Sequence, residues 1–272
     1  MRARRWVLGG VSAIAVVYAL LLALLRASED SLVYHPLPYS EGMERTFGGG
    51  FEDRALTTRG GATIHALHFR REGARRHVLF FHGNGGNAYL LARPLASLSE
   101  SLAADVLAVD YRGYGKSAGA PSERALYEDG EAAFDELSRL AGGGPIVVMG
   151  HSLGGAVAVH VASVRPARAL VLENTFDELP HAAGSHYPWV PTGLLMKNRF
   201  PSRETIQRYR GPLFAAHARH DEVIPFVLGR ALFDAAPSAP KRFFASESGG
   251  HNDPMPEAYW AELAAFLREV ER

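Results

Sequence analysis

The stretch Val147-Val148-Met149-Gly150-His151-Ser152-Leu153-Gly154-Gly155 decides the fold of this chain. The apolar residues 146–149 predict a buried strand, and the small residues 155–164 predict a helix directly after it. Between them lies Gly-x-Ser-x-Gly, the pattern of a nucleophile elbow in its strand–turn–helix context. Side chains at the two outer glycines would collide with the neighbouring strand and helix. The turn is expected to hold the Ser152 hydroxyl at the helix N-terminus, where N–H groups can stabilise an oxyanion.

Strands and helices alternate on both sides of this motif. Residues 54–58 and 63–69 flank Gly60-Gly61 and predict a hairpin. Alternation of this kind predicts an α/β fold with a mostly parallel sheet and helices on both faces. The remaining strands are expected at residues 77–81, 106–110, 169–173, 213–217 and 242–245, and the remaining helices at 89–103, 122–140, 226–235 and 257–270.

The serine needs a base, and the base needs a carboxylate to fix its tautomer. On this fold the chain order is serine, acid, histidine. His251 lies in a glycine-bearing loop before the last helix, and we expect it to be the general base and acid. Asp221 follows the strand at 213–217 and is the expected carboxylate, with Asp177 as the runner-up. Asp253, two residues from His251, is expected to shape the loop.

We do not expect the other histidines after Ser152 to take part in catalysis. His160 lies on the helix after the serine and is expected to be structural. His181 and His186 lie in an insertion and can at most touch substrate. His217, His220 and Asp221 could be mistaken for metal ligands, but no fourth ligand at suitable spacing accompanies them, so we expect no metal and no cofactor.

The loop His82-Gly-Asn-Gly-Gly-Asn87 follows the strand at 77–81. Its glycines allow the backbone to approach a ligand and to turn an N–H inward. We expect the N–H groups of Asn84 and Leu153 to form the oxyanion hole, and His82 to bond the loop backbone. The loop contains neither G-K-[ST] nor G-x-G-x-x-G, which argues against a phosphate-binding loop.

Residues 175–212 interrupt the alternation with five prolines and many aromatic and aliphatic side chains. A connection of this length in an α/β domain is usually functional. We interpret it as a lid whose apolar face contacts substrate through Tyr187, Trp189, Leu194 and Leu195. The alternative is an insertion packed on the surface.

The chain begins with three arginines and an uncharged apolar run at residues 6–25, long enough to cross a bilayer. The positive-inside rule places the N-terminus in the cytoplasm and the remainder on the non-cytoplasmic side. A cleaved signal peptide, giving a secreted protein, is the alternative. Accordingly we divide the chain into an anchor at 1–30, a linker at 31–50 and a catalytic domain at 51–272.

Composition excludes some classes of function. The 272 residues carry a formal net charge of zero, which gives no electrostatic reason to expect nucleic acid as a partner. The chain has no cysteine, so disulfides and thiolate nucleophiles are impossible.

Taken together, these motifs resemble the α/β-hydrolase superfamily, and more narrowly its small, often membrane-anchored serine hydrolases of the lysophospholipase and depalmitoylase type. The resemblance implies a Ser152–Asp221–His251 triad and hydrolysis of an ester or thioester, and with the anchor and the apolar insertion we expect a lipid-like or acyl-chain substrate. A small serine peptidase and a non-catalytic binding protein on the same fold are the alternatives. The motifs that carry it are residues 82–87, 110–117 (Asp-Tyr-Arg-Gly-Tyr-Gly-Lys-Ser), 121–123, 150–155, 173–176 and 249–253 (Gly-Gly-His-Asn-Asp).

Overall fold

A computed structural model describes residues 2–271, with side chains described from residue 10 onward. Within it, an eight-stranded sheet has the order β10-β9-β8-β7-β4-β6-β3-β2. β3 runs antiparallel to both of its neighbours, and the other pairs are parallel. The strands are β2 Glu52–Thr57, β3 Thr63–Phe69, β4 Arg76–Phe81, β6 Ala104–Asp110, β7 Ile146–His151, β8 Ala169–Glu173, β9 Leu213–Ala218 and β10 Lys241–Ser246.

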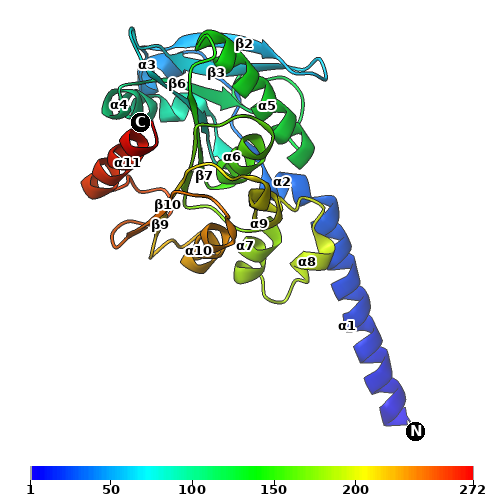
Figure 1. The fold of residues 1–272 in the computed structure, drawn as a ribbon. Helices are drawn as coiled ribbons and strands as arrows, with labels where there is room; N and C mark the ends of the chain where they lie inside the picture. The colour runs from blue at the N-terminus through cyan, green and yellow to red at the C-terminus, as the bar shows by residue number, and fades with distance from the viewer. Residues whose placement is uncertain (1, 272) are drawn as a thin grey trace.

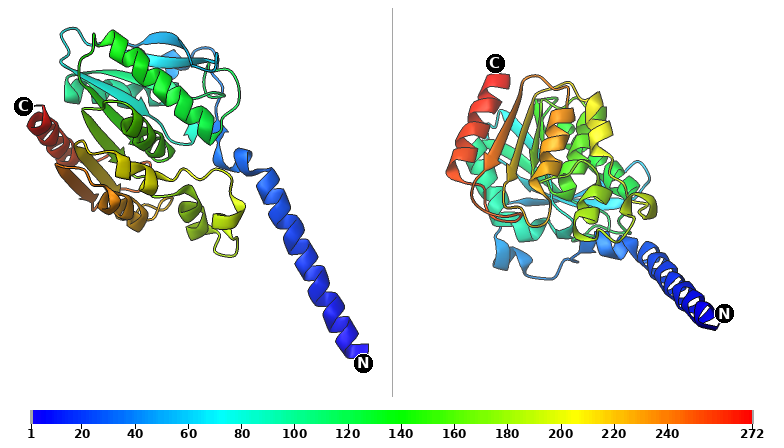
Figure 2. Two further views of the ribbon diagram at one scale, coloured as in Figure 1. Left: turned by 45° about the vertical axis from the view of Figure 1, so that its right-hand side comes forward. Right: turned by 90° about the horizontal axis from the view of Figure 1, so that it is seen from below.

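Helices cover both faces of the sheet, as the alternation predicts (Figures 1 and 2). α5 (Glu123–Leu140), α6 (Leu153–Val164) and α10 (Phe226–Ala235) bury their apolar side chains in one core. α4 (Ala92–Leu102) and α11 (Glu257–Val270) do so in a second core. Alternate residues of β4 enter different cores, because successive strand side chains point to opposite faces.

Most predicted elements are confirmed. The bounds of β8, α10 and α11 agree residue for residue with the expected ranges. α5 begins after Ser122, whose hydroxyl accepts the amide N–H of Ala125, a regular N-cap. The helix expected at 89–103 is divided into the 3₁₀ turn η1 (Ala88–Leu91) and α4.

The N-terminal helix α1 (Arg2–Ala27) extends away from the body of the molecule (Figure 1). Its segment Gly10–Ala27 is long and apolar enough to cross a membrane and is not buried against the domain.

Residues 31–50, expected to be a linker, instead pack against the domain. They include the end of α2 (Glu29–Val33), β1 (His35–Pro36) and α3 (Met43–Phe47), and β1 pairs with β5 (Gly85–Gly86). The physical reason is burial, since the side chains of Val33, Tyr34 and Met43 enter the two cores.

The insertion at 175–212 consists of short helices and helical turns joined by loops. They are α7 (Leu179–His186), α8 (Thr192–Leu195), α9 (Ser202–Thr205) and η2 (Ile206–Arg208). Figure 1 shows α7 and α8 at the end of the domain from which α1 extends, with α8 next to α1.

Candidate active site

Ser152 occupies the sharp turn between β7 and α6 with φ 55° and ψ −125°. This conformation is strained for a residue with a side chain. A Cβ at Gly150 would lie 2.2 Å from the carbonyl oxygen of Gly154, and one at Gly154 would lie 2.2 Å from that of Phe81. Backbone atoms cannot yield by that amount, so the turn requires glycine at both positions.

The fold brings Ser152, His251 and Asp221 together from three distant parts of the chain. The Ser152 hydroxyl lies 3.0 Å from Nε2 of His251, a distance at which it donates a hydrogen bond. Nδ1–H of His251 donates to Oδ2 of Asp221 at 2.8 Å. All three side chains are buried. This arrangement fixes one tautomer of the imidazole, with Nε2 free to accept a proton.

Asp221 is held by groups on both of its oxygens. Oδ1 accepts the amide N–H groups of Val223 at 2.9 Å and Ile224 at 2.7 Å. Oδ2 accepts the hydrogen bond from His251 and also lies 3.3 Å from Nε2 of His217. Burial alone would raise the pKa of Asp221, but the hydrogen bonds from His217, His251 and the backbone outweigh it and hold that pKa well below its usual value.

The loop that carries His251 is anchored at its backbone. The His251 carbonyl accepts hydrogen bonds from Nδ2 of Asn174 at 2.9 Å and from Nε2 of His151 at 3.0 Å. The His251 amide donates to Glu222 at 3.2 Å. Burial, together with the neighbouring His251, lowers the pKa of His151 to about 4, so His151 is a neutral donor at physiological pH.

The loop after β4 lies beside the serine, because a Cβ at Gly83 would be 3.8 Å from the Ser152 hydroxyl. Within residues 2–271, the amide of Asn84 donates to no other protein group, and the amide of Leu153 begins α6 without an intrahelical acceptor. Both amides are available to an oxygen bound at Ser152. The Gly83 carbonyl, which shares a peptide plane with the Asn84 amide, lies 2.8 Å from Nδ1 of His82, and the Asn84 carbonyl accepts the Tyr114 hydroxyl at 2.7 Å, so the peptides on both sides of Asn84 are held.

The remaining sequence candidates have partners other than the serine. The runner-up acid Asp177 pairs with His181 at 3.0 Å in the insertion. Asp253 accepts the Gly250 amide at 2.8 Å and so shapes the His251 loop. His160 contacts Glu131 at 2.9 Å and stacks on an aromatic ring. His82 contacts the Gly83 carbonyl at 2.8 Å, consistent with a structural role.

The four insertion residues expected to contact substrate lie on the outer surface instead. Tyr187, Trp189 and Leu194 are 55%, 53% and 89% exposed, and Leu195 is partly exposed. Side chains exposed to this extent do not line an enclosed pocket around the buried serine. Their apolar surface requires another explanation.

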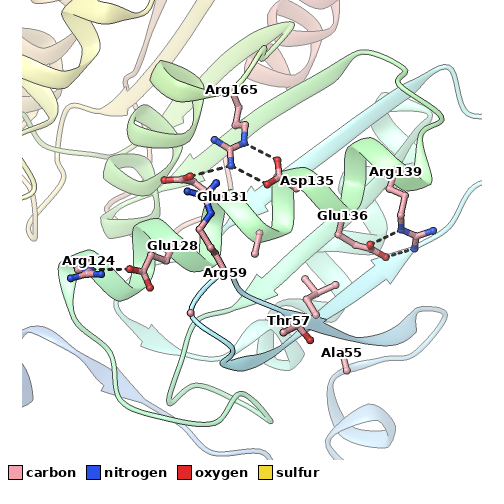
Figure 3. Close-up of a pocket in the computed structure, with 13 residues that line it drawn as sticks. Ala55, Thr57, Arg59, Arg124, Glu128, Glu131, Asp135, Glu136, Arg139 and Arg165 are labelled. Atoms are coloured by element: carbon pink, nitrogen blue, oxygen red, sulfur yellow. Dashed lines mark hydrogen bonds and ion pairs between the residues drawn. The ribbon is translucent and has the colours of Figure 1, made fainter.

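A groove of about 720 Å³ lies elsewhere, between the β2–β3 hairpin and α5 (Figure 3). Its lining is rich in charge, but the charges neutralise one another. Arg165 pairs with Glu131 and Asp135, and Arg139 pairs with Glu136. We assign no ligand to this groove, because it has no contact with Ser152 and its ion pairs satisfy one another. Among the described residues, no cluster of His, Asp and Glu side chains has the geometry of a metal site.

Sequence reasoning missed the groups that support the three central residues, namely His217, His151, Asn174 and Glu222. Two signals were present. His151 occupies the variable position of the elbow next to the serine, and Asn174 directly follows a strand end. Asn174 adopts a positive φ of 45°, a conformation that asparagine tolerates better than most residues.

The fold and this constellation are those of an α/β hydrolase. The chain belongs to the alpha/beta hydrolase family, whose model matches residues 78–271. An uncharacterized protein of Mycobacterium tuberculosis (strain ATCC 25618 / H37Rv) is 33% identical over 248 residues, covering 90% of this chain and 88% of the relative. Protein bem46 of Schizosaccharomyces pombe is 31% identical, covering 96% of this chain and 92% of the relative.

One further relative aligns with this chain over less than half of its own length, and solved structures resemble this chain in fold alone. Lysophosphatidylserine lipase ABHD12 of Macaca fascicularis is 33% identical over 186 residues, which cover 61% of this chain and 46% of that protein. Among solved structures, the esterase Pf2001 of Pyrococcus furiosus superimposes with a TM-score of 0.71 at 18% identity, covering 87% of this chain and 99% of the esterase. At that identity the likeness establishes the fold.

Proposed function

We propose that this protein is a serine hydrolase that cleaves carboxylic ester or thioester bonds through an acyl-enzyme on Ser152. The observation that carries the proposal is the continuous hydrogen-bond chain from the Ser152 hydroxyl through His251 to Asp221, at 3.0 and 2.8 Å. The proposal is supported by relatives described as a lysophosphatidylserine lipase and by structural neighbours described as esterases.

The chemistry follows from these positions. Nε2 of His251 takes the proton as the Ser152 oxygen attacks the carbonyl carbon, and the resulting tetrahedral oxyanion accepts hydrogen bonds from the amides of Asn84 and Leu153. His251 then protonates the leaving alcohol or thiol as its bond to the carbonyl carbon breaks. A water molecule, deprotonated by the same imidazole, attacks the acyl-enzyme and releases the acid and free Ser152.

Asp221 stays ionised during these steps, because its hydrogen bonds keep its pKa low. Its charge stabilises the imidazolium that forms in each transition state. Removing one oxyanion-hole donor costs roughly 100- to 1000-fold in kcat in enzymes of this mechanism.

The proposed substrate is lipid-like, with an acyl chain. We also propose that α1 is a retained single-pass anchor with the catalytic domain on the non-cytoplasmic side. The length and hydropathy of Gly10–Ala27 support this, as do the arginines that precede it. Secretion after signal cleavage is the alternative, and the mass of the N-terminal peptide in purified membranes distinguishes the two.

A fluorophosphonate probe tests the nucleophile. We expect stoichiometric labelling of the wild-type chain and complete loss of labelling in Ser152→Ala, while Ser101→Ala, at an exposed serine on α4, labels normally. Intact protein that never labels would favour the non-catalytic binding protein. Hydrolysis of p-nitroanilides faster than of matched p-nitrophenyl esters would favour the peptidase, and a preference for short over long acyl esters would remove the lipid substrate.

A further inference from the structure

The exposed apolar part of the insertion lies directly beside the candidate membrane span. We propose that residues 187–195 are embedded in the lipid bilayer alongside α1, so that the protein meets the membrane through one rigid two-part surface. We call α1 from Gly10 to Ala27 together with residues 187–195 the membrane surface. The proposal rests on the membrane anchor proposed above, but not on the chemistry at Ser152.

Two hydrogen bonds set the depth of the insertion. The Tyr18 hydroxyl donates to the carbonyl of Trp189 at 2.6 Å, and the Arg26 guanidinium donates to the carbonyl of Leu195. Tyr18 and Arg26 are about two helical turns apart, or roughly 12 Å along the axis. With the charged Arg26 at the level of the headgroups, the Trp189 peptide lies at the top of the hydrocarbon region, since each interfacial layer is about 5–8 Å thick.

The composition of the segment suits that depth. Residues 187–196 read Tyr-Pro-Trp-Val-Pro-Thr-Gly-Leu-Leu-Met and contain no Asp, Glu, Lys or Arg, whereas Lys197 follows immediately. Tyr187 and Trp189 contact each other edge to face, with ring centroids 6.4 Å apart. Tyrosine and tryptophan are enriched at the membrane–water interface, and the side chain of Leu194, 89% exposed, would extend from that interface into the acyl chains.

Most backbone amides of the segment have acceptors within the protein, which suits a medium that offers no hydrogen bonds. The amides of Val190, Thr192, Leu194 and Leu195 donate to carbonyls within the segment. Pro188 and Pro191 have no N–H. The side chains of Tyr18 and Arg26 of α1 donate hydrogen bonds to two carbonyls of the insertion. Neighbouring elements within a membrane must satisfy each other's backbone groups in this way, because lipid offers no partners.

A buried carboxylate on the first residue of α2, two residues after α1 ends, fixes the insertion to this end of the anchor. Glu29, 4% exposed, accepts the amide of Lys197 at 2.9 Å, and the amide and side-chain Nδ2 of Asn198 at 2.7 and 3.0 Å. The Tyr34 hydroxyl donates to Oδ1 of Asn198 at 2.7 Å. This network ties residues 197–198 to the helix end from both sides, so the two parts of the membrane surface keep one geometry.

The same end of the molecule contacts the loop beside Ser152. Nδ2 of Asn84 donates to the carbonyl of Val33 at 2.9 Å, and the amide of His35 donates to the carbonyl of Asn84 at 2.9 Å. The residues that directly follow α1 therefore hold the proposed oxyanion loop.

The absence of cysteine permits a direct test in the full-length protein. Single cysteines at Leu194, at Val11 in α1 and at the exposed Ser101 of α4 are each labelled with an environment-sensitive fluorophore. Each protein is reconstituted in phosphatidylcholine vesicles with or without lipids that carry a nitroxide in the acyl chain. Figure 1 shows α4 on the side of the domain remote from α1.

We expect nitroxide lipids to quench the labels at positions 194 and 11 severalfold more strongly than the label at 101. Quenching at 11 with a water-exposed label at 194 would overturn the proposal and leave the anchor intact. A label at 194 that is shielded from water but not quenched would indicate a protein partner or a second copy, and would also overturn it. No quenching at 11 would refute the anchor and this inference together. Fluorophosphonate labelling of the same samples reports separately on Ser152.

Discussion

Nε2 of His217 lies 3.3 Å from Oδ2 of Asp221, the same oxygen that accepts the hydrogen bond from His251. Nε2 of His217 also lies 2.9 Å from the Ile224 carbonyl, so its N–H is shared between the two oxygens. A Cβ at Gly229 would lie 2.1 Å from the other ring nitrogen of His217, which leaves no room for a side chain there. The carboxylate is thus oriented by a second imidazole that takes no part in the proposed proton transfers.

Replacing His217 should weaken the support of Asp221. We expect His217→Ala to lower the free energy of unfolding by about 1–3 kcal/mol, because a buried carboxylate loses a hydrogen-bond partner. It should also lower kcat while leaving KM nearly unchanged, because His217 acts on the orientation of the catalytic pair. Urea unfolding and steady-state ester hydrolysis measure the two effects.

A double-mutant cycle separates this role from packing. In an Asp221→Ala background, His217→Ala should cost less stability than in the wild-type chain, with a coupling of about 0.5–3 kcal/mol. Equal costs in both backgrounds would mean that His217 only fills space.

The elbow glycine at 154 should tolerate no side chain. A Cβ there would lie 2.2 Å from the Phe81 carbonyl oxygen and 2.5 Å from that of His82. We expect Gly154→Ala to lower stability by at least about 3 kcal/mol, because backbone atoms of two elements would have to separate. Thermal unfolding measures the change.

Gly193→Ala is the matched control, because a Cβ at Gly193 meets nothing within 4 Å. That variant should stay within about 0.5–1 kcal/mol of the wild type, since alanine is favoured over glycine in a helix. Similar losses in both variants would remove the steric explanation of the motif.

The sequence was sufficient for the features that depend on local pattern. The elbow, the strand at β8 and the helices α10 and α11 follow from hydrophobic periodicity with clear turn residues at their ends. The positions of His251 and Asp221 followed from their place after predicted strands, because the carboxyl ends of parallel strands share one edge of the sheet.

Features that depend on distant contacts were not predictable in this way. β1 is only two residues long and pairs with two glycines about 50 residues later, so no periodic pattern in the sequence predicts it. Asn174 and His151 reach a carbonyl in a loop far along the chain. The apolar side chains at 187–195 have the same composition whether they face a substrate or a bilayer, and only their exposure beside α1 separates the two interpretations.

The carboxylate of Glu29 should account for the attachment of the insertion to α1. We expect Glu29→Ala to destabilise the protein by about 2–3 kcal/mol, because the amides of Lys197 and Asn198 lose their side-chain acceptor and Nδ2 of Asn198 loses one of its two acceptors. Hydrogen exchange in residues 187–198 should accelerate in the same variant. Both measurements are made on the full-length protein in detergent or vesicles.

Asp30→Ala provides the comparison. Asp30 lies next to Glu29 and forms a nearly half-exposed ion pair with Lys197 at 2.7 Å, and of the donors of Asn198 it binds only Nδ2, at 2.9 Å, while Glu29 also binds the backbone amide. An exposed pair of this kind contributes about 0–1 kcal/mol. If Asp30→Ala and Glu29→Ala loosen the insertion equally, the buried network is not what holds it.

Glu173, at the carboxyl end of β8, should make the stability of the fold depend on pH. Burial raises the pKa of its carboxyl to about 7, against the opposing effect of the Tyr259 hydroxyl. The folded pKa exceeds the ordinary value of 4.5, so the neutral acid is favoured in the fold. The contribution of the neutral Glu173 carboxyl to the free energy of unfolding is complete below a pH of about 4.5 and is lost as the pH rises through about 7. The free energy of unfolding changes by roughly 3 kcal/mol over this range.

Glu173→Gln removes this ionisation while it keeps the size of the side chain. We expect the variant to match the wild type near pH 5 and to be more stable by about 2–3 kcal/mol at pH 8.5, where the wild-type carboxylate is charged without a cation. Urea unfolding at the two pH values measures the difference, and Glu100→Gln, at an exposed glutamate on α4, should leave both values unchanged. A gain of equal size at both pH values would mean that packing of the amide, and not the charge of Glu173, sets the effect.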